Sequence, residues 1–116
     1  MVSNRSKGMS YVREVRKILE AKGYRVEGPG QKVIYINKKP ISMHKDYFDG
    51  FDLLSYRETY IKGHQVTTLE NKSSRAKKMK DLGLVGYLWC RVKGPHYRIW
   101  FIGWAEEPEE IFESNL

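Results

Sequence analysis

The sequence predicts an α/β fold in which a mixed central β-sheet is flanked by helices, with the elements in the order αβββαββ. An amphipathic segment near the N-terminus repeats its apolar residues at helical spacing, and five later runs are rich in β-branched and aromatic residues. A basic segment of helical period separates the third run from the fourth. A helix at that position permits a parallel crossover inside an otherwise antiparallel sheet. The expected architecture is an α/β sandwich.

The first helix is expected to begin at Ser10, a residue type that caps helices well, and to end near Lys22 because Gly23 follows. One apolar stripe runs along this segment and charged residues occupy the remainder. The stripe consists of Tyr11, Val15, Ile18 and Leu19. The helix therefore packs on another layer.

Strands are predicted at residues 32–37, 51–56, 60–69, 85–92 and 97–104, and residues 41–50 are expected to form a loop across an open face. The second helix is expected to start at Asn71, a good cap residue, and to end at Gly83. It carries apolar residues on one side and many lysines on the other. Residues 1–104 are expected to be one domain, and residues 105–116 an acidic tail that adds a short last turn or stays disordered.

The charge of the chain points to nucleic acid as the first partner to consider. There are 21 Lys and Arg residues against 14 Asp and Glu, which gives a net charge of +7. Five of the acidic residues follow the last basic one, Arg98, so residues 1–104 carry 21 positive against 9 negative charges, or +12. The basic surface is also compatible with a role in solubility alone.

The chain has a single cysteine, Cys90, which excludes an intrachain disulfide. It lies in an apolar run, where a buried structural thiol is the expected state. No segment has the pattern of a signal peptide or the roughly 18 apolar residues that span a bilayer. The expected location is the cytoplasm, in association with the nucleoid.

Acidic and oxygen-bearing side chains gather on two consecutive predicted strands. Asp52 stands at the start of one strand, preceded at intervals of three by Asp49 and Asp46, and Gln65 and Thr67 alternate on the next. Gln65 and Thr67 share a face because strand side chains alternate, and in a hairpin that face can also carry Asp52. Such a cluster could hold a hard cation.

This arrangement resembles the PD-(D/E)xK nuclease superfamily, which includes archaeal Holliday junction resolvases and many restriction endonucleases. The resemblance covers about residues 8–104 and looks closest to small resolvase-like members. It rests on Gly8 followed by the helix with Glu14, the segment of residues 49–54, the strand with Gln65 and Thr67, and the basic helix at residues 71–80. It implies a restriction endonuclease-like fold.

The resemblance also implies roles for these residues. Asp52 matches the aspartate that binds the divalent metal, and Glu14 matches a glutamate that approaches the metal from the first helix. Gln65 and Thr67 occupy the positions of the usual acid and lysine, so the implied Mg²⁺ or Mn²⁺ ligands are Glu14, Asp52, the Gln65 amide and the Val66 carbonyl. Another lysine would then have to take the role of the motif lysine, and the candidates are Lys72, Lys62 and Lys45. His44 and His64 are expected to be surface residues.

The expected partner is double-stranded or branched DNA. Its candidate contacts are the basic side chains on and around the expected site, namely Arg5, Lys7, Lys45, Lys72, Arg75, Lys77 and Lys78. No segment has the features of a base-reading element, so recognition directed by DNA structure or backbone is expected. Outward-facing aromatic residues on the last two strands could form a homodimer surface.

The expected function is hydrolysis of DNA phosphodiester bonds by a metal-activated water, in recombination or repair. The first alternative keeps the fold but not the chemistry, because Gln65 and Thr67 replace the usual acid and lysine, and leaves a DNA-binding protein. A second alternative is an RNA-processing nuclease or a toxin-like module on the same fold.

Overall fold

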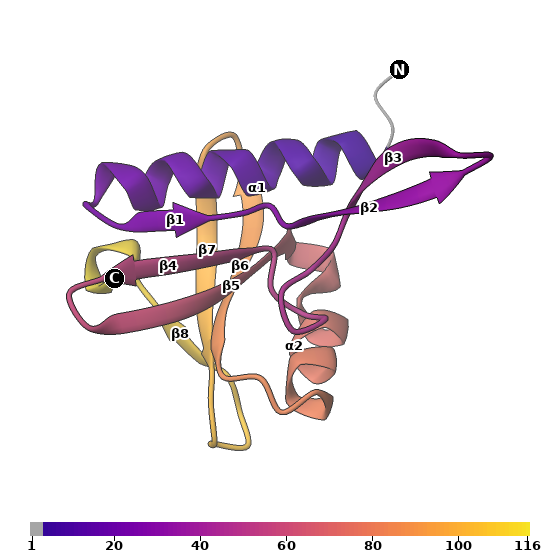
Figure 1. Ribbon diagram of the computed structural model, residues 1–116. Helices are drawn as coiled ribbons and strands as arrows, with labels where there is room; N and C mark the ends of the chain where they lie inside the picture. Colours follow the sequence, from indigo (N-terminus) through magenta and orange to yellow (C-terminus); the bar gives the residue numbers. More distant parts are fainter. Residues whose placement is uncertain (1–3) are drawn as a thin grey trace.

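The structure, a computed structural model, describes the backbone of residues 4–116 and the side chains of residues 7–30, 35–41 and 45–116. A six-stranded sheet forms the centre, α1 and α2 lie on opposite faces of it, and a separate two-stranded hairpin projects to one side (Figure 1). The predicted class, a mixed sheet flanked by helices, is confirmed.

The helix α1 (Asn4–Ala21) starts earlier than predicted, so that Ser10 lies inside it and not at its cap. The predicted stripe does face the sheet: Val15 and Leu19 are fully buried, and Val12 joins them. Gly23 ends the helix with a φ of +91°, and the next residue donates its backbone N–H back to the Leu19 carbonyl at 3.1 Å. No helix in the described part of the chain is long and apolar enough to cross a membrane.

The order of strands across the main sheet is β1-β4-β5-β6-β7-β8, and only the pairing of β5 with β6 is parallel. The predicted crossover makes that parallel pair, through a short η1 (Leu69–Asn71) and α2 (Lys72–Asp81). The strands are β1 (Arg25–Glu27), β4 (Leu53–Arg57), β5 (Tyr60–Thr68), β6 (Gly86–Lys93), β7 (His96–Ile102) and β8 (Glu109–Ile111).

Each face of the sheet has its own apolar cluster. On the α1 face, Leu53, Val66 and Trp89 pack under the buried residues of the helix. On the α2 face, Leu88 and Trp100 meet the helix residues, which include the fully buried Met79. Successive residues of one strand, such as Leu88 and Trp89, therefore enter different clusters, as the period of two requires.

Three strands were not expected from the sequence. The segment predicted as a loop contains β3 (Lys39–His44), which pairs with β2 (Gln31–Ile36) as a hairpin outside the main sheet. β1 has only three residues, too few for a periodic signal. The acidic segment after Trp104 forms β8 and a 3₁₀ turn, η2 (Glu113–Asn115), and Leu116 is buried in the α1-face cluster. This segment belongs to the fold: η2 is the short last turn that the sequence allowed, and the alternative of a disordered tail is wrong.

Candidate active site

Asp52 lies directly before β4, and its side chain is buried where β4 separates from β5. The last paired residues of these strands are Leu53 and His64, so the backbone N–H of Val66 lies beyond the ladder. The Asp52 Oδ2 atom accepts a hydrogen bond from that N–H at 2.7 Å and a second one from the Gln65 Nε2 at 3.3 Å. Asp52 is therefore in direct contact with Gln65 and with the backbone of Val66.

The side-chain oxygen of Gln65 is unusual because it is buried without a hydrogen bond from any described residue. The side chain is buried, its Nε2 donates to Asp52, and its Oε1 is buried with no hydrogen-bond partner in the described part of the chain. A buried amide oxygen without a partner is uncommon and costly. Amide and carboxylate oxygens are the ligands that hard divalent cations prefer. The oxygen beside Asp52 therefore fits a cation.

Thr67 shares the α2 face of the sheet with Gln65, as the sequence predicted. The parallel register places Gln65 beside Leu88 and Thr67 beside Cys90, and both neighbours belong to the α2-face cluster. Val66, between them, packs on the opposite face. The backbone carbonyl of Val66 remains a candidate ligand because it lies on the strand that carries the other two groups.

A polar cleft of about 440 Å³ opens where β5 ends and the two helices begin. The carboxyl end of a strand beside a parallel crossover is a common binding position in α/β folds. Two basic side chains, Lys7 of α1 and Arg75 of α2, share this cleft with Thr67. The full lining is Lys7, Gly8, Tyr11, Val66, Thr67, Thr68, Glu70, Asn71 and Arg75.

The reserve lysines proposed from the sequence do not line this cleft. The Lys72 Nζ lies 4.5 Å from the centre of the Trp100 ring, a cation–π contact under α2. The Lys62 Nζ donates to the Tyr24 hydroxyl at 2.9 Å. Lys45 is exposed at the base of the hairpin. The cations that the fold does bring to Thr67 are Lys7 and Arg75, which the sequence suggested as DNA contacts.

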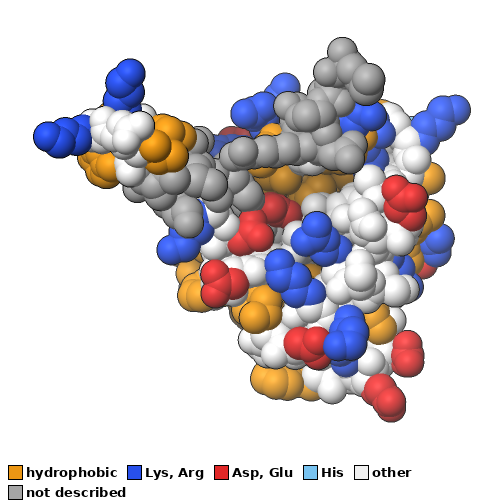
Figure 2. Space-filling view, turned by 90° about the vertical axis from the view of Figure 1, so that its right-hand side faces the viewer, with side chains coloured by type: hydrophobic (Ala, Val, Ile, Leu, Met, Phe, Trp, Pro, Cys, Tyr) orange, Lys and Arg blue, Asp and Glu red, His pale blue; other side chains and the backbone are white. Residues whose placement is uncertain are grey.

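The other predicted DNA contacts lie mainly on α2. Lys77 and Lys78 line a shallow groove together with Asp49, and Lys77 pairs with Asp81 at 2.7 Å. Figure 2 shows several Lys and Arg side chains on the face that α2 and the hairpin share, with acidic side chains between them. The Arg5 side chain lies outside those that the structure describes.

Glu14 is placed with residues of β6 and β7. Its Oε1 accepts the Tyr97 hydroxyl at 2.6 Å and lies 3.8 Å from the Arg91 Nε. Burial and the hydrogen bond to Glu14 raise the pKa of Tyr97. The described contacts thus join Glu14 to this tyrosine and arginine and not to Asp52. No group of three His, Cys, Asp or Glu residues forms a ligand set within the described side chains.

A second acidic residue, Asp46, lies on a chain segment that adjoins Asp52. Tyr47 and Phe51 form an isolated antiparallel bridge, with the Tyr47 N–H donating to the Phe51 carbonyl at 2.7 Å. Asp46 precedes the first of these residues and Asp52 follows the second, so they lie on adjoining segments. Asp49, the other acidic residue of this stretch, is exposed in the loop between.

His64 is fully buried and is not the expected surface residue. The Trp89 Nε1 lies 2.9 Å from its Nδ1, and because an indole can only donate, Nδ1 accepts. The proton therefore resides on Nε2, which donates to the Ser55 Oγ at 2.7 Å. Burial, aided by the charge of Lys62, lowers the pKa of His64 to about 3. This imidazole is a neutral structural group. The His44 side chain lies outside the described ones.

Tyr11 and Glu70 are among the cleft residues that sequence reasoning did not assign to the site. Glu70 follows Thr67 by three residues, in the short turn between β5 and α2. Its position just after β5, the strand with Gln65 and Thr67, could have identified it, because residues at the end of such a strand line the cleft. Tyr11 was assigned to the apolar stripe and is only half-buried, so it serves both surfaces.

Comparison of the chain with protein-family models, with curated proteins and with solved structures found no match.

Proposed function

We propose that the protein is a metal-dependent DNA endonuclease with a restriction endonuclease-like fold, acting on double-stranded or branched DNA. The observation that carries the proposal is the contact between the buried Asp52 carboxylate and the Gln65 amide, whose Oε1 is left without a partner. The parallel pairing of β5 with β6 through a basic helix supports the same proposal.

The donor set fits Mg²⁺ or Mn²⁺. Asp52, the Gln65 Oε1 and the Val66 carbonyl would hold the ion, which when bound supplies a Lewis acid and a more acidic water. The site has one carboxylate fewer than an acid at position 65 would give, so we expect weak affinity. Asp46, on the adjoining segment, could supply a second carboxylate.

The remaining roles fall to residues of the cleft. Thr67 stands in the lysine position, where its hydroxyl can orient a water by hydrogen bonding but carries no charge. Lys7 and Arg75 line the same cleft and would neutralise phosphate charge there. The cleft thus contains cations to replace the missing lysine, from elements other than β5.

One observation favours the alternative of a DNA-binding protein without catalysis. The Asp52 carboxylate already accepts the Val66 N–H, so this residue has a structural task independent of any metal. With Thr67 in place of a lysine, the site would then bind DNA without cutting it. RNA cleavage is a third outcome that the same assay detects.

The proposal is tested by incubating supercoiled plasmid, a four-way junction and an RNA duplex with the protein in Mg²⁺ or Mn²⁺. Asp52→Asn is the informative variant, because the amide oxygen can still accept the Val66 N–H while the charge is lost. Glu14→Gln is the matched control, since it also removes one carboxylate charge and can still accept from Tyr97.

We expect the native protein and Glu14→Gln to cut DNA, and Asp52→Asn to lose activity by at least about 100-fold, the usual scale for removing a group that stabilises the transition state. Equal, metal-independent DNA binding without cleavage by all three proteins would establish the alternative. Cleavage restricted to RNA would reassign the substrate.

A further inference from the structure

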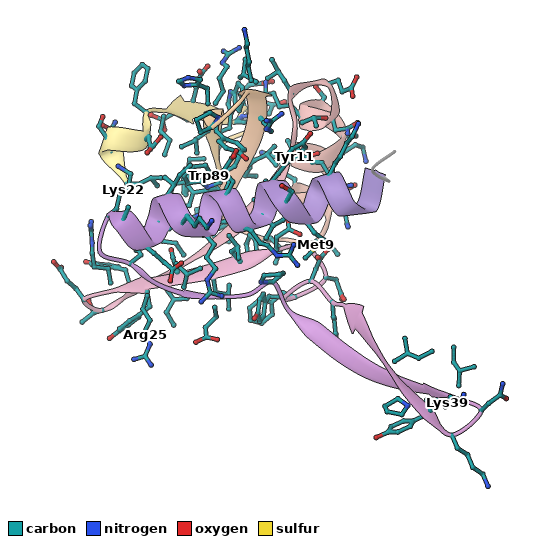
Figure 3. All side chains as sticks on the ribbon, turned by 90° about the horizontal axis from the view of Figure 1, so that it is seen from above. Met9, Tyr11, Lys22, Arg25, Lys39 and Trp89 are labelled. Atoms are coloured by element: carbon teal, nitrogen blue, oxygen red, sulfur yellow. The ribbon has the colours of Figure 1, made fainter. Side chains whose placement is uncertain are left out.

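The β2–β3 hairpin projects from the body as an arm (Figure 1, Figure 3). Its strands pair from Gln31 with His44 at the base to Ile36 with Lys39 at the tip, which leaves only Asn37 and Lys38 as the turn. At about 3.4 Å per residue, six residues give the arm a length of about 20 Å. All residues from Tyr35 to Ile41 are exposed.

The turn has an unusual residue for its conformation. Asn37 has a φ of 52° and Lys38 a φ of 64°, which are the two positive values of a type I′ turn. Asn tolerates this region, but Lys adopts it rarely, and glycine normally occupies the second position. A strained residue at an exposed tip points to a use for its side chain. Together with Lys39 it places two ammonium groups at the end of the arm.

Apolar side chains flank the basic tip. Cross-strand partners point to the same side of a ribbon, so Tyr35 and Pro40 share one side, and Ile36 and Lys39 share the other. Tyr35 is 73% exposed and Ile36 51% exposed. Neither side is covered by the body at these positions. The arm therefore offers a narrow amphipathic ribbon with a positive end.

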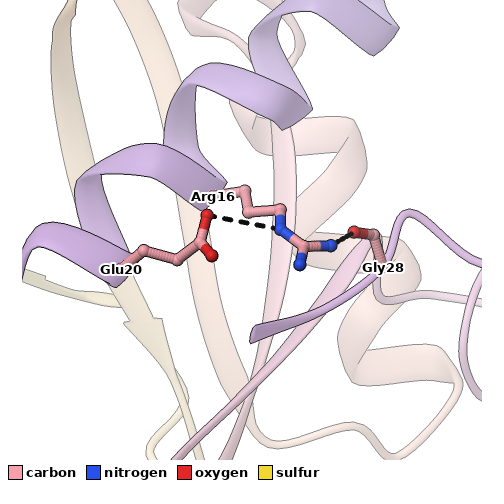
Figure 4. A network of polar contacts seen from close by, with 3 residues as sticks. All are labelled: Arg16, Glu20 and Gly28. Atoms are coloured by element: carbon pink, nitrogen blue, oxygen red, sulfur yellow. Dashed lines mark hydrogen bonds and ion pairs between the residues drawn. The ribbon is translucent and has the colours of Figure 1, made fainter. Parts of the chain in front are cut away.

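The root of the arm is fixed to the body beside the candidate active site. The Lys45 N–H donates to the Gly30 carbonyl at 2.9 Å and closes the base. The Arg16 guanidinium of α1 binds Glu20 and the Gly28 carbonyl, just before the arm (Figure 4). A Cβ at Gly28 would lie 2.6 Å from the Asp52 carbonyl oxygen, so the chain passes directly against Asp52.

We propose that this arm enters the major groove of a DNA duplex and that Lys38 and Lys39 contact its phosphates. The major groove is about 12 Å wide and admits a two-stranded β-ribbon. The basic tip and the net charge of +7 complement a polyanion, whereas a second copy of this chain would oppose them with like charge. The inference rests on the proposed function only for the identity of the partner. It adds the position of the duplex, which would run past Asp52.

Binding is measured without metal, by fluorescence anisotropy of a labelled 30-base-pair duplex at several salt concentrations. The test variant is Lys38→Gly/Lys39→Thr, which makes the favourable Asn-Gly turn and keeps a good strand residue at position 39. The matched control is Lys17→Gln/Lys93→Thr, which removes the same charge from exposed positions on α1 and at the end of β6. Circular dichroism establishes that both variants are folded.

We expect the tip variant to bind about tenfold more weakly and to lose about 1.8 from the slope of log K against log salt, since each phosphate contact contributes about 0.9. The control should change the slope by less than half as much. Equal effects of both variants would overturn the inference, because general charge would then explain them. Loss of a dimer in sedimentation with unchanged DNA binding would overturn it too and assign the arm to self-association. Because no cleavage is measured, the inference can survive an inactive protein.

Discussion

The carboxylate of Asp52 takes the place of a strand carbonyl opposite Val66, whose backbone N–H it accepts at 2.7 Å. One side chain therefore extends the hydrogen-bond ladder between β4 and β5 and also belongs to the candidate metal site. These two tasks can be separated by substitution, because only the second requires a charge.

We expect Asp52→Ala to lower the free energy of unfolding by about 1–3 kcal/mol, the cost of a buried donor left without an acceptor. Asp52→Asn should cost less, since its amide oxygen can still accept the Val66 N–H. Urea unfolding of the metal-free proteins measures both. Equal losses for the two variants would show that the negative charge itself stabilises the fold.

A divalent ion should stabilise the native protein through the Gln65 oxygen. We expect Tm to rise with Mn²⁺ concentration, because a ligand that binds only the folded state shifts unfolding by mass action. Gln65→Leu should abolish this rise and leave the metal-free Tm within a few degrees, since the buried oxygen that it removes has no described partner and the hydrogen bond that it removes, from Nε2 to Asp52, is long at 3.3 Å. A Tm rise of the same size in Gln65→Leu would place the ion elsewhere.

Acid should destabilise the protein through His64. Its pKa is about 3 in the folded state against 6.5 in the unfolded chain, so between these values only the unfolded chain takes up the proton. The contribution of the neutral His64 to the free energy of unfolding is present above pH 6.5. It falls as the pH is lowered, by about 2 kcal/mol at pH 5. The measurement is urea unfolding from pH 7 to pH 5, with His64→Gln as the control. The variant should be less stable at pH 7 but lose less on acidification.

The thiol of Cys90 should be inert in the folded protein. The residue is fully buried on the α2 face, and burial raises its pKa to about 12 although Lys72 and Arg98 oppose the shift. Because the thiolate is the reactive form, we expect a thiol reagent at pH 8 to label less than a tenth of the folded protein in the time that labels it fully in urea. Rapid labelling without denaturant would mean that β6 opens readily.

The sequence predicted the parts of the fold that leave a periodic signal. The stripe on α1, the long strands β5 to β7 and the crossover through α2 all have one, and the burial of Cys90 followed from its apolar run. The start of α1 was wrong because Ser10 also fits within a helix. β1 and β8 were missed because three residues cannot show a period, and β8 is stabilised by tertiary contacts such as the Arg98–Glu110 pair at 2.6 Å.

The candidate site was predictable only in its local part. The spacing of Gln65 and Thr67 placed them on one face, and the strand start placed Asp52 next to Gln65. The partner of Glu14 could not be predicted, because Tyr97 follows it by 83 residues and only the fold brings them together. The burial of His64 depends in the same way on Trp89, across a parallel pair.

The two edges of the main sheet constrain how copies of this protein can assemble. β1 and β8, the edge strands, have three residues each, while the long strands β5 and β6 lie at the centre. Short edges offer few unpaired backbone groups to another chain, and natural proteins use them to prevent strand addition. A main sheet continuous across two molecules is therefore disfavoured, and a symmetric dimer would have to form through side chains or through the longer strands of the β2–β3 arm.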